Sequence, residues 1–330
     1  MRRVCVTGGA GFIGGHVIDA LLQRSDIEYV LNVDALTYAA SRALITQHQQ
    51  DMRYQWEQCR LEHAQGLLTQ LLRDKRIDTI LHLAAESHVD RSILDPQPFI
   101  ESNILGTYAL LEAARTSATL EKFIHVSTDE VYGSLLPGQA PFTENSPYRP
   151  SSPYSASKAS SDHLVMAYQH TYQLPAIITH CTNNFGPRQY PEKLIPKVMQ
   201  AILAEQPIPI YGTGDNVRDW LYVSDHVQAL FTIAEKGTAP VYTISAGQQK
   251  SNLWVIENLC DLMDAHLGRM QGQSRGLMRF VTDRPGHDFA YGLEAGPLRA
   301  LGWQPSYSVE QGLKVMVEAY LQEQAACTLQ

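Results

Sequence analysis

The sequence predicts an α/β protein with a doubly wound parallel sheet and a smaller C-terminal α/β region. Two patterns predict this fold class. Short β-branched runs alternate with helical patterns through the first half of the chain, and proline residues break the alternation after about residue 183. Strand–helix–strand alternation is typical of parallel strands joined by crossover helices. The broken second half is typical of a smaller region packed beside the sheet.

The elements of the first half follow from this alternation. We expect the first strand at residues 3–7 and the first helix at 12–23, where Ile13, Val17 and Leu21 repeat at helical spacing. Further strands are expected at 29–33, 79–83 and 123–126. These runs are nearly all apolar, because parallel strands are covered by helices on both faces.

After residue 183 the predicted elements are shorter and more widely spaced. Isolated strands are expected at 242–245 and 279–282, and helices at 252–266 and 308–320. We therefore expect a first domain over residues 1–182 and a second region over 183–330, with the chain returning to the first domain near 221–247.

The composition is that of a globular protein that binds neither nucleic acid nor membranes. Lysine and arginine number 26 against 34 for aspartate and glutamate, which gives a net charge of −8. An acidic balance disfavours polyanionic partners, nucleic acid and anionic lipid alike. Since the chain has no apolar run of about 18 residues or more, we expect no membrane span.

The N-terminus and the cysteines favour a cytoplasmic setting. A glycine cluster begins at residue 8, so the apolar stretch before it is too short for a secretion signal. The five cysteines are scattered and form no CxxC pair, which argues against a zinc site and against a disulfide framework. We therefore expect a protein of the reducing cytoplasm without a bound metal.

A glycine-rich turn joins the first predicted strand to the first predicted helix. Residues 7–14 read Thr-Gly-Gly-Ala-Gly-Phe-Ile-Gly, with Gly8, Gly11 and Gly14 spaced by three. Glycine permits the tight turn and the close approach of a pyrophosphate, and the helix N-terminus offers free N–H groups. Loops also use glycine for positive φ alone. The position between strand and helix favours a dinucleotide-binding, Rossmann-type domain.

An acidic residue, Asp34, follows the second predicted strand. A carboxylate at this point accepts hydrogen bonds from the ribose hydroxyls of adenosine and repels a 2′-phosphate. The turn and the acid together therefore predict NAD, rather than NADP, as the cofactor.

A tyrosine and a lysine follow in a predicted helix. Tyr154 and Lys158 are spaced as i and i+4, so they lie on one helix face. A nearby ammonium lowers the pKa of a tyrosine toward the range useful for a base. Such pairs are usually surface neighbours. Here the pair comes after a dinucleotide turn and after Ser127-Thr128 at a strand end, an order that is the signature of the short-chain dehydrogenase/reductase fold.

The segment Ser-Thr-Asp-Glu-Val-Tyr-Gly at 127–133 narrows the comparison within that superfamily. The chain is similar to the extended branch, which acts on nucleotide sugars. Its Asp129-Glu130 pair resembles that of dTDP-glucose 4,6-dehydratases, where 4-epimerases have small residues. The same resemblance is carried by segments at 84–92, 183–187, 191–196, 214–220 and 283–288. Together the segments extend over nearly the whole chain.

The resemblance implies a hydro-lyase of deoxysugar biosynthesis. It would convert dTDP-glucose to dTDP-4-keto-6-deoxy-glucose and water, with NAD recycled within each turnover. Tyr154 would be the base for the 4-hydroxyl, with Lys158 holding its pKa down and Thr128 hydrogen-bonding the same oxygen. Glu130 would remove the C5 proton and Asp129 would protonate the departing 6-hydroxyl. Adjacent carboxyls can divide these roles when their pKa values differ.

The resemblance also implies two sets of binding residues. The cofactor set contains Gly8, Gly11, Phe12, Ile13, Gly14, Asp34, Leu36, Thr37, Leu83, Ala84, Ala85, Ser87, Ser102, Tyr154, Lys158 and Asn184. The substrate set contains Ser87, Thr128, Asn183, Lys193, Leu194, Pro209, Tyr211, Arg218, Asn252, Arg284, His287 and Tyr291. Its basic side chains would meet the pyrophosphate of the nucleotide sugar.

The resemblance further implies a homodimer through a four-helix bundle. Two long helices of each subunit would form the bundle, at about 97–116 and 153–172. Tyr108, Leu111 and Val165 are candidate contacts, although packing of the helices on the sheet explains apolar residues there equally well.

Several positions depart from the dehydratase pattern. Ala35, Gln58, Cys59 and Ser102 replace the usual residues around the cofactor. His180, Phe289 and Ala290 stand where arginine is frequent. The first group bears on cofactor affinity, and the second on the preference for nucleotide or sugar.

Three alternatives stay open at this stage. The same reaction on UDP-glucose or another NDP-glucose fits the motifs equally well, so the choice between thymine and uracil is open. A 4-epimerase or a decarboxylase acting on a nucleotide sugar is the second alternative. A 4-epimerase needs no C5 base, so Asp129-Glu130 argues against it. A non-catalytic dinucleotide-sensing protein would be expected to lose some catalytic side chains, and all of them are present.

Overall fold

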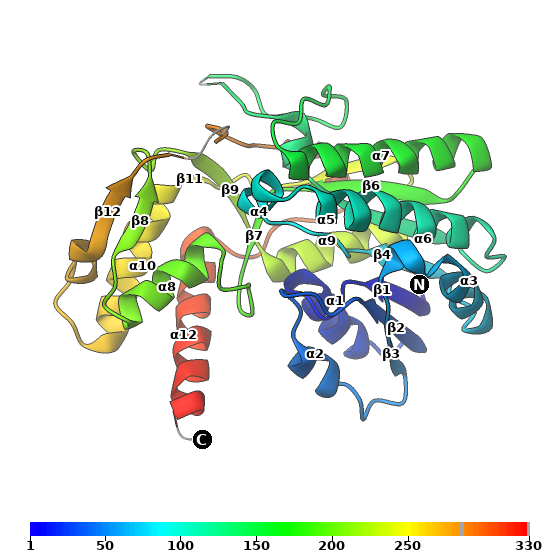
Figure 1. Cartoon of the computed structure of the whole chain (residues 1–330), viewed down its shortest axis with the longest axis horizontal. Helices are drawn as coiled ribbons and strands as arrows, with labels where there is room; N and C mark the ends of the chain where they lie inside the picture. Colours follow the sequence, from blue (N-terminus) through cyan, green and yellow to red (C-terminus); the bar gives the residue numbers. More distant parts are fainter. Residues whose placement is uncertain (137, 284–286, 329–330) are drawn as a thin grey trace.

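A seven-stranded parallel sheet has the strand order β3-β2-β1-β4-β5-β6-β10. It forms the larger part of the protein, at the right in Figure 1. The computed structural model describes residues 1–136, 138–283 and 287–328. All neighbouring strands in this sheet are parallel, which confirms the predicted fold class. The strands are β1 (Arg3–Thr7), β2 (Tyr29–Asp34), β3 (Tyr54–Gln58), β4 (Thr79–His82), β5 (Lys122–Thr128), β6 (Ala176–Cys181) and β10 (Val241–Ile244).

Helices cover both faces of this sheet. Helices α1 (Phe12–Leu22) and α9 (Val223–Lys236) enclose one apolar core against the strands. Helices α3 (Gln65–Asp74), α6 (Gly106–Arg115) and α7 (Pro153–Tyr172) enclose a second core. Burial on both sides explains why the strand sequences are nearly continuous apolar runs.

The C-terminal part packs two small sheets and three helices around a third apolar core. The sheets contain β7 (Asn183–Phe185), β9 (Val217–Tyr222) and β11 (Gln249–Ser251), and β8 (Ile208–Tyr211) beside β12 (Met278–Val281). The helices are α8 (Leu194–Leu203), α10 (Asn252–Leu267) and α12 (Val309–Thr328). Figure 1 shows this part at the left of the large sheet. Of the helices in the described ranges, none is long and apolar enough to cross a membrane.

Shorter helical segments connect these elements. They are α2 (Arg42–Thr46), α4 (Val89–Leu94), α5 (Gln97–Phe99), α11 (Gly296–Ala300), the π-helix η2 (Ile100–Leu105) and the 3₁₀ segments η1 (Leu61–His63), η3 (Asp129–Tyr132) and η4 (Ser274–Leu277).

The expectation of an isolated strand at 242–245 is wrong. Strand β10 joins the large sheet, because α9 returns the chain to the edge strand β6, where Tyr242 lies opposite Thr179. The sequence pattern identifies a strand but not its partner. The proposed division of the chain at 182/183 stays a prediction.

The two helices predicted for the dimer interface also differ from expectation. The predicted helix at 97–116 consists of α5, η2 and α6 in succession, and η2 carries the buried Asn103. Leu111 and Val165 belong to the core between helices and sheet and are fully buried within this chain. They are therefore unsuited as contacts with a second subunit, whereas Tyr108 is 43% exposed.

The order of the strands determines where a ligand can bind. From β1 the sheet extends through β2 and β3 in one direction and through β4, β5 and β6 in the other. Ligands of open α/β sheets bind beyond the carboxyl ends of the strands at such a reversal. The functional site is therefore expected next to the carboxyl ends of β1 and β4.

Candidate active site

A cavity of about 330 Å³ lies at this reversal and is called the first cavity below. Leu36 is the one predicted cofactor residue outside its wall, since its amide instead donates to Asp34 Oδ1 at 2.7 Å. The other predicted cofactor residues all line it: Gly8, Gly11, Phe12, Ile13, Gly14, Asp34, Thr37, Leu83, Ala84, Ala85, Ser87, Ser102, Tyr154, Lys158 and Asn184.

The glycine turn forms part of this wall and has no room for side chains. Gly8 has a φ of +75°, and a Cβ there would lie 2.8 Å from the Cα of Ala84. A Cβ on Gly14 would overlap the carbonyl oxygen of Gly8. The first turn of α1 has neither a side-chain cap nor an acidic residue. Its N–H groups are therefore left for an anionic ligand.

Asp34 is buried at the end of β2 and is held by two backbone amides. Its Oδ2 accepts from Ala10 at 2.9 Å, and its Oδ1 accepts from Leu36. Burial raises the pKa of the Asp34 carboxyl, and the two amide hydrogen bonds oppose that rise. Since a carboxylate oxygen accepts more than one hydrogen bond, Asp34 retains capacity for hydroxyl donors in the cavity.

Helix α7 begins at a strong N-terminal signal. Ser152 and Ser155 form a reciprocal capping box, and Pro153 occupies the first turn, where its missing N–H costs nothing. This start sets the register of α7, so that Tyr154 and Lys158 both reach the wall of the first cavity.

Tyr154 and Lys158 lie buried beside the end of β5. Lys158 Nζ donates to the carbonyl oxygen of Val126 at 2.9 Å. Burial lowers the pKa of the Lys158 ammonium, and Asp162 opposes that fall. Burial and the charge of Glu130 raise the pKa of Tyr154, whereas its hydrogen bond with Thr128 lowers it. A further positive charge in the cavity would therefore favour the phenolate.

Asp129 and Glu130 follow β5 and differ in their surroundings. Thr128 Oγ1 donates to Asp129 Oδ1 at 3.3 Å and accepts from the Glu130 amide at 3.3 Å. Burial, and then the charge of Glu130, raise the pKa of Asp129 well above its usual range. Burial thus favours the protonated, neutral form of Asp129. Its Oδ2 has no hydrogen-bond partner among the described residues. Neighbouring carboxyls held in different states can act as acid and base.

A second cavity of about 700 Å³ is continuous with the first. The residues that line both are Ser87, Glu130, Asn183, Tyr190, Glu192 and Lys193. Of the predicted substrate residues, Thr128 lines the first cavity only, and Arg284 lies outside the described residues. The rest line the second cavity: Ser87, Asn183, Lys193, Leu194, Pro209, Tyr211, Arg218, Asn252, His287 and Tyr291.

Two basic side chains give the second cavity a positive wall. Arg218 is only 5% exposed, and its guanidinium donates to the carbonyl oxygens of Val217 at 2.8 Å and Asp288 at 3.1 Å. The guanidinium also lies 4.4 Å from the centre of the Tyr291 ring. Lys193 Nζ donates to the carbonyl oxygen of Ser87 at 2.9 Å. Cations fixed in this way fit an anionic ligand such as a pyrophosphate.

Glu192, Tyr38 and Arg91 form a group that we name the Glu192 clasp, and the sequence analysis missed it. The Tyr38 hydroxyl donates to Glu192 Oε1 at 3.0 Å, and Arg91 Nε donates to Oε2 at 3.0 Å. The clasp links the segments that follow β2, β4 and β7. The motif at 191–196 gave a signal for Glu192, but spacing cannot pair residues 154 positions apart.

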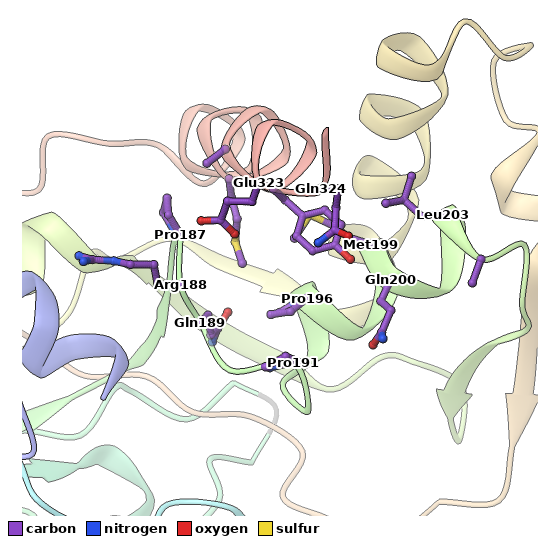
Figure 2. Close-up of a pocket in the computed structure, with 14 residues that line it drawn as sticks. Pro187, Arg188, Gln189, Pro191, Pro196, Met199, Gln200, Leu203, Glu323 and Gln324 are labelled. Carbon is purple, nitrogen blue, oxygen red and sulfur yellow. The ribbon is translucent and has the colours of Figure 1, made fainter. Parts of the chain in front are cut away.

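A third cavity, of about 490 Å³, lies behind the segment that carries the clasp (Figure 2). It is enclosed by residues 187–191, α8 and the C-terminal half of α12. Met199, Leu203 and Pro196 contribute apolar walls, and Arg188 points away toward α1, where it pairs with Asp19. The residues predicted to bind the cofactor or to act as acid and base are not in this wall.

Comparisons with known proteins agree with the site. A family model described as GDP-mannose 4,6 dehydratase matches residues 5–316. The dTDP-glucose 4,6-dehydratase of Xanthomonas campestris pv. campestris (strain B100) is 46% identical, over 98% of this chain and 94% of its own. The enzyme of that name from Salmonella typhimurium is also 46% identical, over 97% and 92%. The chain belongs to the dTDP-glucose 4,6-dehydratase family. This confirms the resemblance stated from the motifs.

A solved member of the dTDP-glucose 4,6-dehydratase family has the same fold. The enzyme from Streptomyces venezuelae, whose structure contains NAD, superposes with a TM-score of 0.89 at 39% identity. The alignment covers 98% of both chains. The doubly wound sheet and the C-terminal part therefore occur together in a dehydratase of known structure.

The departures from the dehydratase pattern are unevenly placed around the cavities. Ala35 and Ser102 line the first cavity, and the Cys59 amide donates to the carbonyl oxygen of Asp34 at 3.1 Å. His180 is fully buried and outside the walls of the three cavities. Phe289 is 42% exposed and is also absent from these walls. The changes that touch a cavity therefore concern the first one.

Proposed function

We propose that this chain is an NAD-dependent dTDP-glucose 4,6-dehydratase, which forms dTDP-4-keto-6-deoxy-glucose and water. The observation that carries the proposal is the carboxyl pair after β5. Glu130 lines both cavities, and burial favours the protonated form of the neighbouring Asp129 by raising the pKa of its carboxyl. Removal of a proton and of a hydroxyl from neighbouring carbons needs one base and one acid. The names of the relatives support the same reaction.

The first cavity fits NAD. The glycine turn admits a pyrophosphate against the N-terminus of α1, and Asp34 accepts from ribose hydroxyls and disfavours a 2′-phosphate. Lys158 lines the same cavity and would help to hold the cofactor. When bound, NAD supplies the oxidising centre that takes a hydride from C4 of the sugar and returns it to C6.

Tyr154 carries out the first proton transfer in this proposal. Its phenolate oxygen takes the proton of the 4-hydroxyl, and Thr128 donates a hydrogen bond to the same region. The Lys158 ammonium favours the phenolate by charge. Because Tyr154 is buried, water does not compete for its proton.

Asp129 and Glu130 carry out the second step. The 4-ketone acidifies the C5 proton, which the Glu130 carboxylate accepts. Asp129 gives its proton to the 6-oxygen, so that the C6–O bond breaks and water leaves. Glu130 then returns its proton to C5. The proton that Tyr154 took from the 4-hydroxyl balances the one that Asp129 gave to the leaving water, and its return to Asp129, directly or through solvent, restores both groups for the next turnover.

The second cavity holds the nucleotide sugar. Lys193 and Arg218 meet the pyrophosphate, and Asn183 and Asn252 donate to phosphate or sugar oxygens. Glu130 and Asn183 line both cavities. The sugar therefore sits where the two cavities join, within reach of Tyr154.

The test is incubation of the purified protein with dTDP-glucose and, separately, UDP-glucose, without added reductant. We expect a product from dTDP-glucose that is lighter by one water and carries a 4-ketone. The UDP-glucose arm decides the nucleotide preference. An isomer of unchanged mass would show a 4-epimerase, and NAD binding without turnover would show a sensing protein.

We also propose a homodimer in the cytoplasm. The exposed apolar side chains of the α5–η2–α6 segment support a helical interface. Ile100 is 49%, Leu105 47% and Tyr108 43% exposed. Pairing of this segment and α7 with their copies would form a four-helix bundle. The proposed step belongs to deoxysugar biosynthesis.

A further inference from the structure

A buried polar cluster lies beside Lys158, between α7 and strands β5 and β6. We name it the Asp162 cluster, and it consists of Asp162, His125, Ser127 and His180. Asp162 and both histidines are fully buried. The proposed proton transfers do not use any of these side chains. Burial of a carboxylate destabilises the folded protein unless hydrogen-bond donors or a positive charge compensate for the lost water. The partners of Asp162 therefore indicate its role.

The contacts of Asp162 come from both neighbouring strands. Asp162 Oδ2 accepts from Ser127 Oγ at 2.9 Å and lies 3.1 Å from His180 Nε2. Its Oδ1 lies 3.1 Å from His125 Nε2, which is hydrogen-bonded to Ser161 Oγ at 3.2 Å. Neither lysine nor arginine is among these partners. The contacts hold the carboxylate in place but supply no permanent positive charge.

Lys158 is the buried cation that this carboxylate can balance. Asp162 follows Lys158 by four positions in α7, so the two side chains lie on one helix face. Lys158 is 3% exposed and donates to a neutral acceptor, the carbonyl oxygen of Val126. Burial favours loss of its proton, and Asp162 is the largest influence that opposes this.

We propose that Asp162 is a positioning residue that keeps the buried Lys158 protonated, and that it thereby prepares Tyr154 to act as a base. The inference rests on the proposed function and deepens it, since it explains how an ammonium shielded from water keeps its charge. Asp162 touches neither cavity. It acts through Lys158.

The other titratable groups around the pair do not supply this charge. On β5 and β6, burial lowers the pKa of His125 to about 4 and raises that of Cys181 to about 12, so both are neutral near pH 7. The hydroxyl of Tyr132, from η3, lies 2.9 Å from His180 Nδ1. The hydroxyl of Tyr148, from the segment before α7, lies 3.0 Å from His180 Nε2.

The remaining neighbours come from η3 and β4. Burial raises the pKa of Asp129 and so disfavours its charged form, and the charge of Glu130 acts on Tyr154. On β4, burial keeps His82 neutral, since its pKa lies well below the usual range. The Asp162 carboxylate is therefore the negative charge available to Lys158.

The test compares the pH dependence of kcat in the wild type and in Asp162→Asn, both loaded with NAD. With Lys158 uncharged, Tyr154 would ionise at higher pH. We expect the acid limb of the profile to move up by about one unit or more, with a roughly tenfold lower kcat at neutral pH and recovery in alkali. A limb that stays in place, or moves to lower pH, overturns the inference.

Tyr148→Phe is the matched control. It removes a hydroxyl that is hydrogen-bonded to His180 of the cluster and leaves the charges of Asp162 and Lys158 in place. The acid limb of the pH profile should therefore not move. Asp162→Glu keeps the charge and should restore the wild-type limb. If the charge of Asp162 is the cause, the acid limb of the pH profile does not move as far in Tyr148→Phe as in Asp162→Asn. Equal movement in the two variants would show a general effect on packing and would contradict the inference.

Two further measurements keep the outcome decisive. If Asp162→Asn does not fold, the double variant Lys158→Met/Asp162→Asn is tested, because it removes both buried charges and should fold. A double variant that is also unfolded contradicts the proposed balance between Asp162 and Lys158. If the wild type makes no dehydrated product, the proposed function fails. The tyrosinate absorbance, measured as a difference from Tyr154→Phe, then still reports whether Asp162→Asn moves the ionisation of Tyr154 to higher pH.

Discussion

The guanidinium of Arg91 lies 3.8 Å from the centre of the Tyr38 ring, and both side chains bind the carboxylate of Glu192. The Glu192 clasp thus joins segments that follow three different strands, one of them helix α4. Glu192 also lines both cavities. A nucleotide enclosed by these loops would have to break the clasp before leaving.

The clasp predicts slow release of NAD. Glu192→Gln removes the charge from the contacts with Arg91 and Tyr38 and weakens them by about 1 kcal/mol. We therefore expect NAD to dissociate about fivefold faster, measured as the cofactor retained after rapid gel filtration. Glu310→Gln is the control, because Glu310 pairs with Lys250 at 3.3 Å away from the cavities. Equal retention in both variants would refute a role for the clasp.

The glycine turn predicts a large effect from a single methyl group. Gly14→Ala places a Cβ against the carbonyl oxygen of Gly8, and overlap in a packed turn costs about 1–3 kcal/mol. NAD affinity should fall by roughly 5- to 150-fold, measured by calorimetry. Gly66→Ala is the control, since a Cβ there meets no atom within 4 Å in α3. It should raise the free energy of unfolding by roughly 0.4–1 kcal/mol and leave NAD affinity unchanged.

The first cavity was largely predictable because its signals are local. Gly8, Gly14 and Asp34 lie within one strand–turn–helix–strand unit, and Tyr154 and Lys158 share one helix face. In each case short spacing fixes the geometry, and the five residues line the first cavity. Their roles in binding and catalysis stay predictions. The roles of the carboxyl pair came from resemblance and stay predictions, although the burial of Asp129 gives the reason for its acid form.

The features that the sequence did not predict depend on contacts between distant parts of the chain. The Glu192 clasp pairs Tyr38 with a residue 154 positions away, and the Asp162 cluster brings together α7, β5 and β6. The place of β10 depends on the path of α9. No local sequence pattern predicts these contacts, because they depend on how whole helices and strands pack against one another.

The raised pKa of Asp129 predicts an unusual pH dependence of stability. An acid whose pKa is raised by folding stabilises the protein at low pH, and this contribution falls as pH increases from the unfolded value toward the folded one. Asp129→Asn cannot ionise. We therefore expect the melting temperature of the wild type to fall relative to Asp129→Asn as pH rises above about 4. Parallel curves would contradict the neutral form of Asp129.

The same variant should lose the dehydration step. Without an acid at position 129, departure of the 6-hydroxyl is unassisted, and general acid catalysis contributes about 10²–10⁴-fold. Product formation should fall within that range, measured by mass spectrometry of the sugar nucleotide. A variant that still forms product at the wild-type rate would assign the acid elsewhere.

The exposed face of the α5–η2–α6 segment predicts that one charge can prevent dimerisation. Tyr108 is 43% exposed on this face, and Tyr108→Glu would bury a carboxylate in an apolar interface. We expect a dimer for the wild type and a monomer for the variant in analytical ultracentrifugation. Leu136→Glu is the control, since Leu136 is 70% exposed outside these helices. A wild-type monomer would refute the homodimer.

The junction of the two cavities predicts that Glu130→Gln separates oxidation from water loss. Tyr154 and Lys158 are unchanged in this variant, and loss of the Glu130 charge removes an influence that raises the pKa of Tyr154. Oxidation at C4 should therefore continue, seen as the absorbance of reduced cofactor in the protein after mixing with dTDP-glucose. The C5 proton then has no base, so water loss should slow by about 10²–10⁴-fold. Exchange of the C5 hydrogen with deuterated solvent is the direct readout and should vanish. Normal turnover of Glu130→Gln would show that another group is the C5 base. If the variant also failed to oxidise C4, Glu130 would take part in the first step, the oxidation at C4.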